Sequence, residues 1–182
     1  MNLPNKLTIL RMVLIPFFVL FLLAPLFENP MMGRHIALVI FIAASITDTL
    51  DGYIARKHNM ITDFGKFMDP LADKLLVCAA LICLVSLAEI PAWIVIVIIS
   101  REFIISGFRL IAADNGIVIA ASWWGKVKTI CQMVMIIVIL LHFSPAPFRV
   151  LEQVLVWASL VLTVVSLLDY LIKNRSVLSH QK

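Results

Sequence analysis

The chain has 182 residues, of which 62% are hydrophobic and 14% are charged. Soluble domains carry about 25% charged residues, so this composition excludes an ordinary soluble enzyme or binding module. The formal net charge is +4, but the cations form no exposed soluble patch. We therefore relate this charge to membrane topology and an anionic lipid surface, and we expect no nucleic-acid partner.

Six apolar runs are long enough to cross a hydrocarbon core of ~30 Å as helices, for which roughly 17–25 residues are needed. These runs are residues 9–27, 35–56, 67–88, 92–111, 127–143 and 151–172. Only short segments join them, so we expect an all-α integral membrane protein with six transmembrane helices. Residues 1–182 then form a single membrane domain, in agreement with the mean hydropathy of +1.04.

Lysine and arginine set the expected orientation, because they are enriched on the cytoplasmic side. With the N-terminus in the cytoplasm, only Arg34 and Arg149 among the 15 basic residues lie outside. Six spans return the C-terminus to the cytoplasm, and we expect a multi-pass protein of the cell membrane. Lys6 and Arg11 near the first run also suit a signal peptide. That run is long and no cleavage pattern follows it, so we expect it to be retained.

The segment "LPNKLTILR" at the start of the first run carries a polar stripe. Asn5, Thr8 and Arg11 occupy positions i, i+3 and i+6. We expect this stripe to lie at the cytoplasmic interface.

Four aspartates stand at the facing borders of the second and third runs. Asp48 and Asp51 follow helical spacing i, i+3, and Asp69 and Asp73 follow i, i+4, so each pair lies on one helix face. The segment that joins the two runs is short, which favours antiparallel neighbours. An acid deep in a membrane costs about 2.5–3.5 kcal/mol, and a shared cation reduces that cost. The spacing therefore predicts a site for Mg²⁺ or Mn²⁺ in a cleft open to the cytoplasm.

Three other residues of the same stretch differ in their expected roles. Gly52 costs a helix about 1 kcal/mol relative to alanine, so either a close helix contact or a bound ligand explains it. Beside it, Arg56 can offer its donors to a phosphate. Asp63 is out of register with the other four aspartates, and we expect it at the solvated surface. The three cysteines and four histidines share no zinc-ligand spacing.

The stretch from Asp48 to Asp73 resembles the signature of the CDP-alcohol phosphatidyltransferase family, D-x2-D-G-x2-A-R-x8-G-x3-D-x3-D. All eight fixed positions and both gap lengths match. The resemblance implies a six-span membrane core, a homodimer and displacement of CMP from a CDP-linked substrate by an alcohol, with two metal ions per site. It implies metal binding by the four aspartates, with Asp73 also as the base. The residues expected along CDP-diacylglycerol are Asn5, Thr8, Gly52, Arg56, Thr62 and Gly65.

Basic residues in the fourth and fifth runs bear on the identity of the alcohol. "SREFIISGFRL" places Arg101 and Arg109 eight residues apart, and "SWWGKVKT" carries Lys126 and Lys128. Such cations are also ordinary topology and snorkelling residues. The two lysines are about 200° apart on a helix, so we expect only one of them to face a given pocket. Arg101 and Glu102 lie about two turns inside the fourth run, which favours a function for the pair.

These cations together predict a pocket for an acceptor that bears its own phosphate. The flanking segments resemble the bacterial members of the family that use glycerol 3-phosphate, with P-N-x-L-T-x-x-R, R-E-x-x-x-S-x-x-R and G-K-x-K-T in the same order. The resemblance implies that CDP-diacylglycerol and sn-glycerol 3-phosphate give phosphatidylglycerophosphate and CMP at the cytoplasmic face. The acceptor phosphate is expected at Arg101, Arg109, Lys126 and Lys128.

Two other functions fit parts of the pattern. The same chemistry with serine, an inositol phosphate or phosphatidylglycerol as acceptor would preserve the aspartate site. A divalent-cation transporter would also need intramembrane acids. However, it predicts polar residues along a route to the outer face, where this sequence has almost none. No G-x-x-x-G pattern marks a dimer interface.

Overall fold

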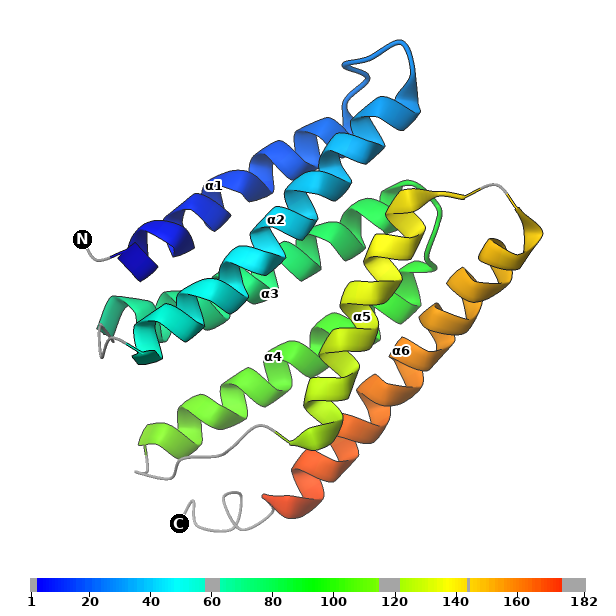
Figure 1. Cartoon of the computed structure of the whole chain (residues 1–182). Helices are drawn as coiled ribbons and strands as arrows, with labels where there is room; N and C mark the ends of the chain where they lie inside the picture. The colour runs from blue at the N-terminus through cyan, green and yellow to red at the C-terminus, as the bar shows by residue number, and fades with distance from the viewer. Residues whose placement is uncertain (1–2, 58–62, 115–121, 144, 175–182) are drawn as a thin grey trace. The chain divides into compact units, whose positions relative to one another are not determined.

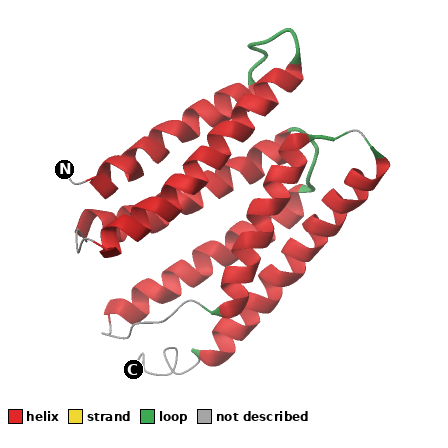
Figure 2. Cartoon of the chain, in the orientation of Figure 1, coloured by secondary structure: helices red, strands yellow, loops and turns green. Residues whose placement is uncertain are grey.

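The computed structural model describes residues 3–57, 63–114, 122–143 and 145–174. For residues 3, 4, 48–57, 63–67, 69, 70, 73, 113 and 114 only the backbone is described. In these ranges the chain forms α-helices joined by turns, as Figure 2 shows. The helices are α1 (Leu3–Leu23), α2 (Pro30–Lys57), α3 (Asp63–Ser86), α4 (Ala92–Asp114), α5 (Trp123–Leu141) and α6 (Ala146–Lys173). The predicted all-α fold is confirmed.

Each of the six predicted apolar runs corresponds to one helix, but most helices begin earlier than predicted. Hydropathy detects only the part of a helix suited to lipid, whereas caps extend helices into polar sequence. Asn29 caps α2 through a hydrogen bond from Met31 N to Asn29 Oδ1 (3.0 Å). Ser122 caps α5 in the same way, accepting from Gly125 N at 3.1 Å. Helix α1 ends at Leu23 rather than residue 27, because the proline at position 25 disfavours helical backbone in the residue before it.

The chain groups into two compact units, which we describe separately. Unit 1 comprises Met1–Glu89 with Ile139–His142, and unit 2 comprises Ile90–Val138 with Phe143–Lys182.

Unit 1 is built on α1, which packs against both α2 and α3. These three helices run side by side (Figure 1). The rings of Phe18 on α1 and Phe41 on α2 are fully buried, with centroids 6.0 Å apart. The small residues Ala37 and Ala44 are also fully buried on α2, which lets its neighbours approach closely.

The contact between α1 and α2 is closest at Gly33. A Cβ added there would lie 2.5 Å from the backbone oxygen of Phe21, so the two backbones would have to separate. We expect Gly33→Ala to destabilise the protein by about 1–3 kcal/mol through overpacking. Thermal unfolding in detergent measures this. The matched control is Gly107→Ala on α4, where an added Cβ meets nothing within 4 Å. Equal unfolding temperatures for both variants would contradict the close contact.

Unit 2 contains α4, α6 and most of α5. Helix α4 contacts α6, and Trp93 packs against Trp157 with ring centroids 6.0 Å apart. Two buried hydroxyls on α6 bond within the helix: Thr163 Oγ1 donates to the carbonyl of Ser159 (2.7 Å), and Ser166 Oγ donates to the carbonyl of Thr163 (3.0 Å). This arrangement avoids the cost of an unpaired polar group in an apolar interior.

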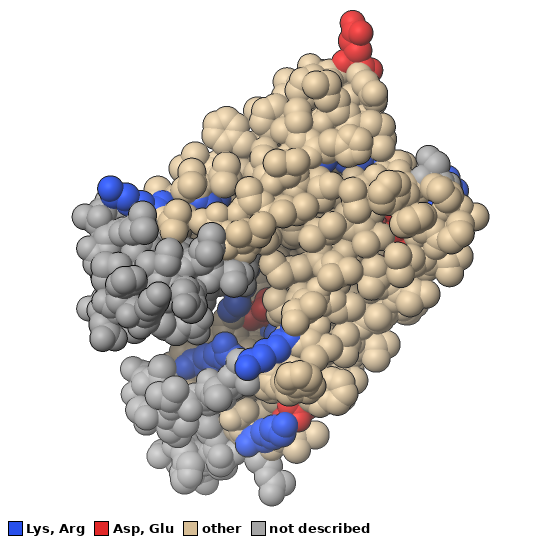
Figure 3. All heavy atoms as spheres, viewed as in Figure 1, with Lys and Arg blue, Asp and Glu red and all other residues tan. Residues whose placement is uncertain are grey.

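Within the described residues, four helices are long and apolar enough to cross a membrane: Asn5–Leu23, Pro30–Thr47, Trp123–Leu141 and Ala146–Lys173. Helix α3 contributes a shorter apolar stretch, Lys74–Ser86. The face of the molecule shown in Figure 3 is predominantly uncharged. Large apolar side chains such as Phe103 (67% exposed) and Val39 (65%) project outward, as expected for a surface in lipid. These features support an integral membrane protein.

Candidate active site

The four signature aspartates lie on two helices of unit 1. Asp48 and Asp51 belong to the last turns of α2, and Asp69 and Asp73 belong to the first half of α3. Helices α2 and α3 contact each other and run in opposite directions (Figure 1), as predicted for the two segments. Because α2 ends at Lys57 and α3 begins at Asp63, both pairs lie at the same end of the unit.

Contacts at the other end of the unit support this alignment. Gly33 on α2 lies against Phe21 on α1, and Arg34 on α2 reaches Glu89, three residues beyond the end of α3. At ~1.5 Å per residue, Asp48 lies about 20 Å from Arg34 along α2, and Asp73 lies about 20 Å from Ser86 along α3. The two aspartate pairs are therefore at similar levels along the helices.

The polar stripe of α1 reaches the same level. Counting equal rises from the contact of Phe21 with Gly33 places Asn5, Thr8 and Arg11 beside residues 49, 46 and 43 of α2. Asn5 therefore lies near the level of Asp48, and Arg11 lies about 8 Å further along the helix. All three side chains are buried, with exposed fractions of 9%, 0% and 0%, and all three have interaction partners. A fully buried guanidinium is costly without compensating charge and hydrogen bonds. Its position on α1 therefore favours a charged environment at this end of unit 1.

The donor chemistry of the aspartates fits a divalent cation of the magnesium type. Carboxylate oxygens are the ligands that Mg²⁺ and Mn²⁺ prefer, and the backbone brings two pairs of them to one level on contacting helices. Among the residues whose side chains are described, no group of three or more His, Cys, Asp or Glu residues forms a metal site. The four aspartate side chains fall outside that set, so the metal site stays a prediction.

The expected nucleotide contacts are placed only in part. Gly52 and Arg56 belong to α2 and Gly65 to α3, close to the aspartates along the backbone. Thr62 lies outside the described residues. Asn5 and Thr8 lie on the buried face of α1. The nucleotide-binding role of these residues therefore stays a prediction as well.

Unit 2 contains a buried cluster of two cations and one carboxylate. The Glu102 carboxylate accepts a hydrogen bond from Arg101 Nη1 (2.9 Å) and a short one from Lys128 Nζ. The side chains of Arg101 and Lys128 are 8% and 3% exposed, and that of Glu102 is 17% exposed. Among the described side chains, one carboxylate thus contacts two cations.

Two further observations indicate that this cluster suits an anion. Arg101 Nε is buried and makes no hydrogen bond in the described structure, so it keeps an unused donor. The first turn of α5 lies alongside, because a Cβ at Gly125 would be 3.4 Å from Arg101 Nη2. The N-terminus of a helix carries partial positive charge and favours anions.

The remaining predicted acceptor residues, Lys126 and Arg109, are more exposed to solvent than the residues of this cluster. Lys126 is exposed, whereas Lys128 is buried against Glu102; that only one of them faces the acceptor stays a prediction. Arg109 is exposed and lies over the ring of Tyr170, with Cζ 6.0 Å from the ring centroid. This cation–π geometry holds the guanidinium against α6.

Glu102 is the residue of this cluster that the sequence analysis did not assign to the site. The signal was present, since an acid inside an apolar helix is expensive and usually functional. What the sequence could not give is the partner from α5, because Lys128 is 26 residues away. Glu102 holds both cations, and we describe it as a positioning residue.

Comparison with known proteins shows the family of the chain. Residues 1–165 match the CDP-alcohol phosphatidyltransferase family, and the chain belongs to that family. It is 48% identical to the CDP-diacylglycerol–glycerol-3-phosphate 3-phosphatidyltransferase of Bacillus subtilis, with 95% of each chain covered. It is 41% identical to the protein of the same name from Haemophilus influenzae, over 93% of this chain and 91% of the relative. A probable phosphatidylglycerophosphate synthase of Mycobacterium tuberculosis is 42% identical, over 93% of this chain and 79% of the relative.

Proposed function

We propose that this chain transfers the phosphatidyl group of CDP-diacylglycerol to sn-glycerol 3-phosphate and releases CMP. The observation that carries the proposal is the division of the complete signature between two contacting helices, with all four aspartates at one end. The names of the similar proteins support the choice of substrates. The cluster of Arg101, Glu102 and Lys128 supports an acceptor that carries a phosphate.

The aspartates Asp48, Asp51, Asp69 and Asp73 hold two divalent cations, Mg²⁺ or Mn²⁺, in this proposal. When bound, such ions neutralise the pyrophosphate and stabilise the departing CMP. Family membership supports their presence. Asn5, Thr8, Gly52, Arg56, Thr62 and Gly65 bind the CDP-diacylglycerol, with Arg56 as the donor to phosphate.

The reaction forms one bond and breaks one bond at the phosphatidyl phosphorus. A hydroxyl oxygen of glycerol 3-phosphate attacks that phosphorus, and the bridging oxygen of the pyrophosphate leaves with CMP. Asp73 takes the proton from the attacking hydroxyl as general base. Arg101 and Lys128 bind the acceptor phosphate through charge-assisted hydrogen bonds, and Glu102 positions both cations. The positive charges of Arg109 and Lys126 attract the acceptor phosphate as the acceptor enters the site.

The proposal also includes topology and assembly. All six helices cross the cell membrane, both termini lie in the cytoplasm, and the active site opens to the cytoplasm. The charged side chains of Arg101, Glu102 and Arg109 explain why α4 is not among the four helices that are apolar enough throughout to cross a membrane. We also propose that residues 1–182 form one catalytic domain. Family resemblance supports a homodimer.

An acceptor comparison tests the proposed function. Purified protein with CDP-diacylglycerol and Mg²⁺ should release CMP with glycerol 3-phosphate, and release none with serine, inositol phosphate or phosphatidylglycerol. Turnover with one of the other acceptors would preserve the transferase chemistry and refute the assigned acceptor. Release of CMP with none of them would refute the proposed activity.

The two lysines of α5 offer a matched pair for testing the acceptor site. Lys128 is buried against Glu102, and Lys126, two residues before it, is exposed. We expect Lys128→Ala to raise the KM for glycerol 3-phosphate about 10-fold or more, because it removes a charge-assisted hydrogen bond. We expect a smaller change for Lys126→Ala, and an unchanged KM for CDP-diacylglycerol in both. Steady-state kinetics with each substrate varied measures these values, and a larger effect at Lys126 would contradict the assignment.

A further inference from the structure

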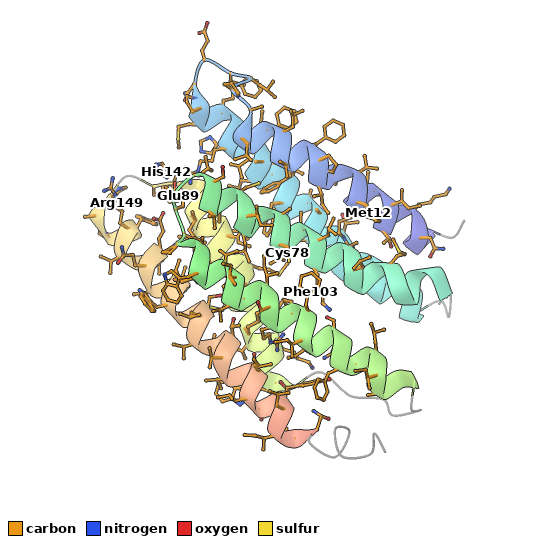
Figure 4. All side chains as sticks on the ribbon, turned by 180° about the vertical axis from the view of Figure 1, so that it is seen from behind. Met12, Cys78, Glu89, Phe103, His142 and Arg149 are labelled. Atoms are coloured by element: carbon orange, nitrogen blue, oxygen red, sulfur yellow. The ribbon has the colours of Figure 1, made fainter. Side chains whose placement is uncertain are left out.

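A second polar cluster lies at the end of unit 1 opposite the aspartates. Arg34 Nη2 on α2 donates to Glu89 Oε1 at 2.6 Å and to the backbone oxygen of Ile139 at 3.1 Å. His142 Nδ1 lies 3.4 Å from the same Glu89 oxygen. Figure 4 shows Glu89 and His142 next to each other at this end. The cluster joins α2, the turn after α3 and the end of α5.

The pair of Arg34 and Glu89 is well shielded from water. The two side chains are 12% and 21% exposed, whereas His142 is 45% exposed. A pair with such short, charge-assisted contacts is stronger than a surface salt bridge. Breaking it would leave a partly buried charge without compensation.

The backbone at this corner is also unusual. Among the described residues, the non-glycine positions with positive φ are Ala88 (58°) and His142 (47°), one in each of the two chain segments that meet there. Such conformations are unfavourable for residues with a side chain and persist where the surrounding structure holds them. Here they turn the chain so that Glu89 and His142 meet.

The position of the pair suggests what it does. Both α2 and α3 pack mainly against α1, and the direct contact of α2 with α3 is the smallest of the three helix pairs in unit 1. At the end of unit 1 opposite the aspartates, sliding of α2 along α3 is opposed by the bond from Arg34 to Glu89.

We propose that Arg34 and Glu89 are positioning residues for the catalytic carboxylates, because their ion pair sets the level of Asp48 and Asp51 against Asp69 and Asp73. The inference rests on the proposed metal-binding function of those aspartates. Four carboxylates from two helices can bind the same cations only when the helices keep one position relative to each other along their axes. Coordination distances tolerate little error. A slip of the helices would weaken metal binding about 20 Å away.

The direct test is Mn²⁺ binding to the purified full chain, measured without substrates by electron paramagnetic resonance. The variants are Arg34→Met, Glu89→Gln, and the exchange Arg34→Glu with Glu89→Arg. We expect each single variant to weaken Mn²⁺ binding about 10-fold or more, as losses in the surroundings of metal sites do. We expect the exchange to return the affinity to within about threefold of the native value, because the ion pair re-forms.

A destabilised control separates positioning from general loss of stability. Leu22→Ala removes a buried side chain of α1 in the same unit and lowers the unfolding temperature while it keeps both charges of the pair. We expect native Mn²⁺ affinity in this variant, and a KM for glycerol 3-phosphate near the native value in all variants. Glu89→Gln keeps the shape of the side chain, so it serves if Arg34→Met fails to fold.

The outcomes distinguish the two proposals. Native Mn²⁺ affinity in both single variants, or an equal loss in Leu22→Ala, would overturn the positioning role while the proposed function stands. Failure of the native protein to bind Mn²⁺ would overturn the metal site and the positioning role together.

Discussion

Replacing Asp73 with asparagine is expected to lower kcat about 10²–10⁴-fold, which is the usual contribution of a general base. The amide cannot accept the proton of the attacking hydroxyl, and it is a weaker ligand than a carboxylate for a hard cation. The helix itself should tolerate the change, because asparagine has nearly the same shape. Initial rates of CMP release and thermal unfolding, measured on the same preparation, test both expectations.

Asp63 provides the control on the same helix. It is the first residue of α3 and lies outside the signature register. We expect Asp63→Asn to retain native activity. If both variants were equally active, Asp73 would be neither base nor metal ligand, and the proposed mechanism would be wrong.

The second large effect is expected at Arg101. Its guanidinium is buried, is held by Glu102 at 2.9 Å, and keeps an unused Nε donor. We expect Arg101→Ala to raise the KM for glycerol 3-phosphate about 30-fold or more, equivalent to about 2 kcal/mol for a lost buried charge pair. The KM for CDP-diacylglycerol should change little, because the residues proposed to bind the nucleotide belong to unit 1.

Arg149 is the matched control for Arg101. It is an exposed arginine of α6, and it lies on the outer side in the proposed topology. We expect Arg149→Ala to leave both KM values unchanged. Arg101→Lys adds a finer test, since lysine keeps the charge but lacks the planar fork of donors. A KM increase for CDP-diacylglycerol rather than for the acceptor in Arg101→Ala would reassign the cluster to the nucleotide.

The sequence predicted the helices and the aspartate stretch because both depend on local spacing. Six apolar runs correspond to six described helices, and the acids at Asp48 and Asp73 fall on neighbouring helices as their positions require. Helix ends were less accurate. Caps such as Asn29 and Ser122 extend α2 and α5 beyond the apolar residues that hydropathy detects.

Hydrophobic periodicity does not predict contacts between segments that are far apart in the chain. The pairing of Glu102 with Lys128 and that of Arg34 with Glu89 both join residues far apart in the chain. The spacing of Lys126 and Lys128 indicated that only one would face a pocket, but it could not indicate which. In the structure Lys128 is buried and Lys126 is exposed, which favours Lys128 in the proposed acceptor site. Arg34 was interpreted only as an outer-side topology residue, although its guanidinium connects three segments.

The central claim is that this chain makes phosphatidylglycerophosphate from CDP-diacylglycerol and glycerol 3-phosphate. The most direct measurement supplies both substrates and Mg²⁺ to the purified protein and quantifies the lipid product by mass spectrometry beside the CMP released. We expect the two products in equal amounts, and neither after a chelator has removed the divalent cations. Release of CMP without phosphatidylglycerophosphate, or product formation that survives the chelator, would contradict the account.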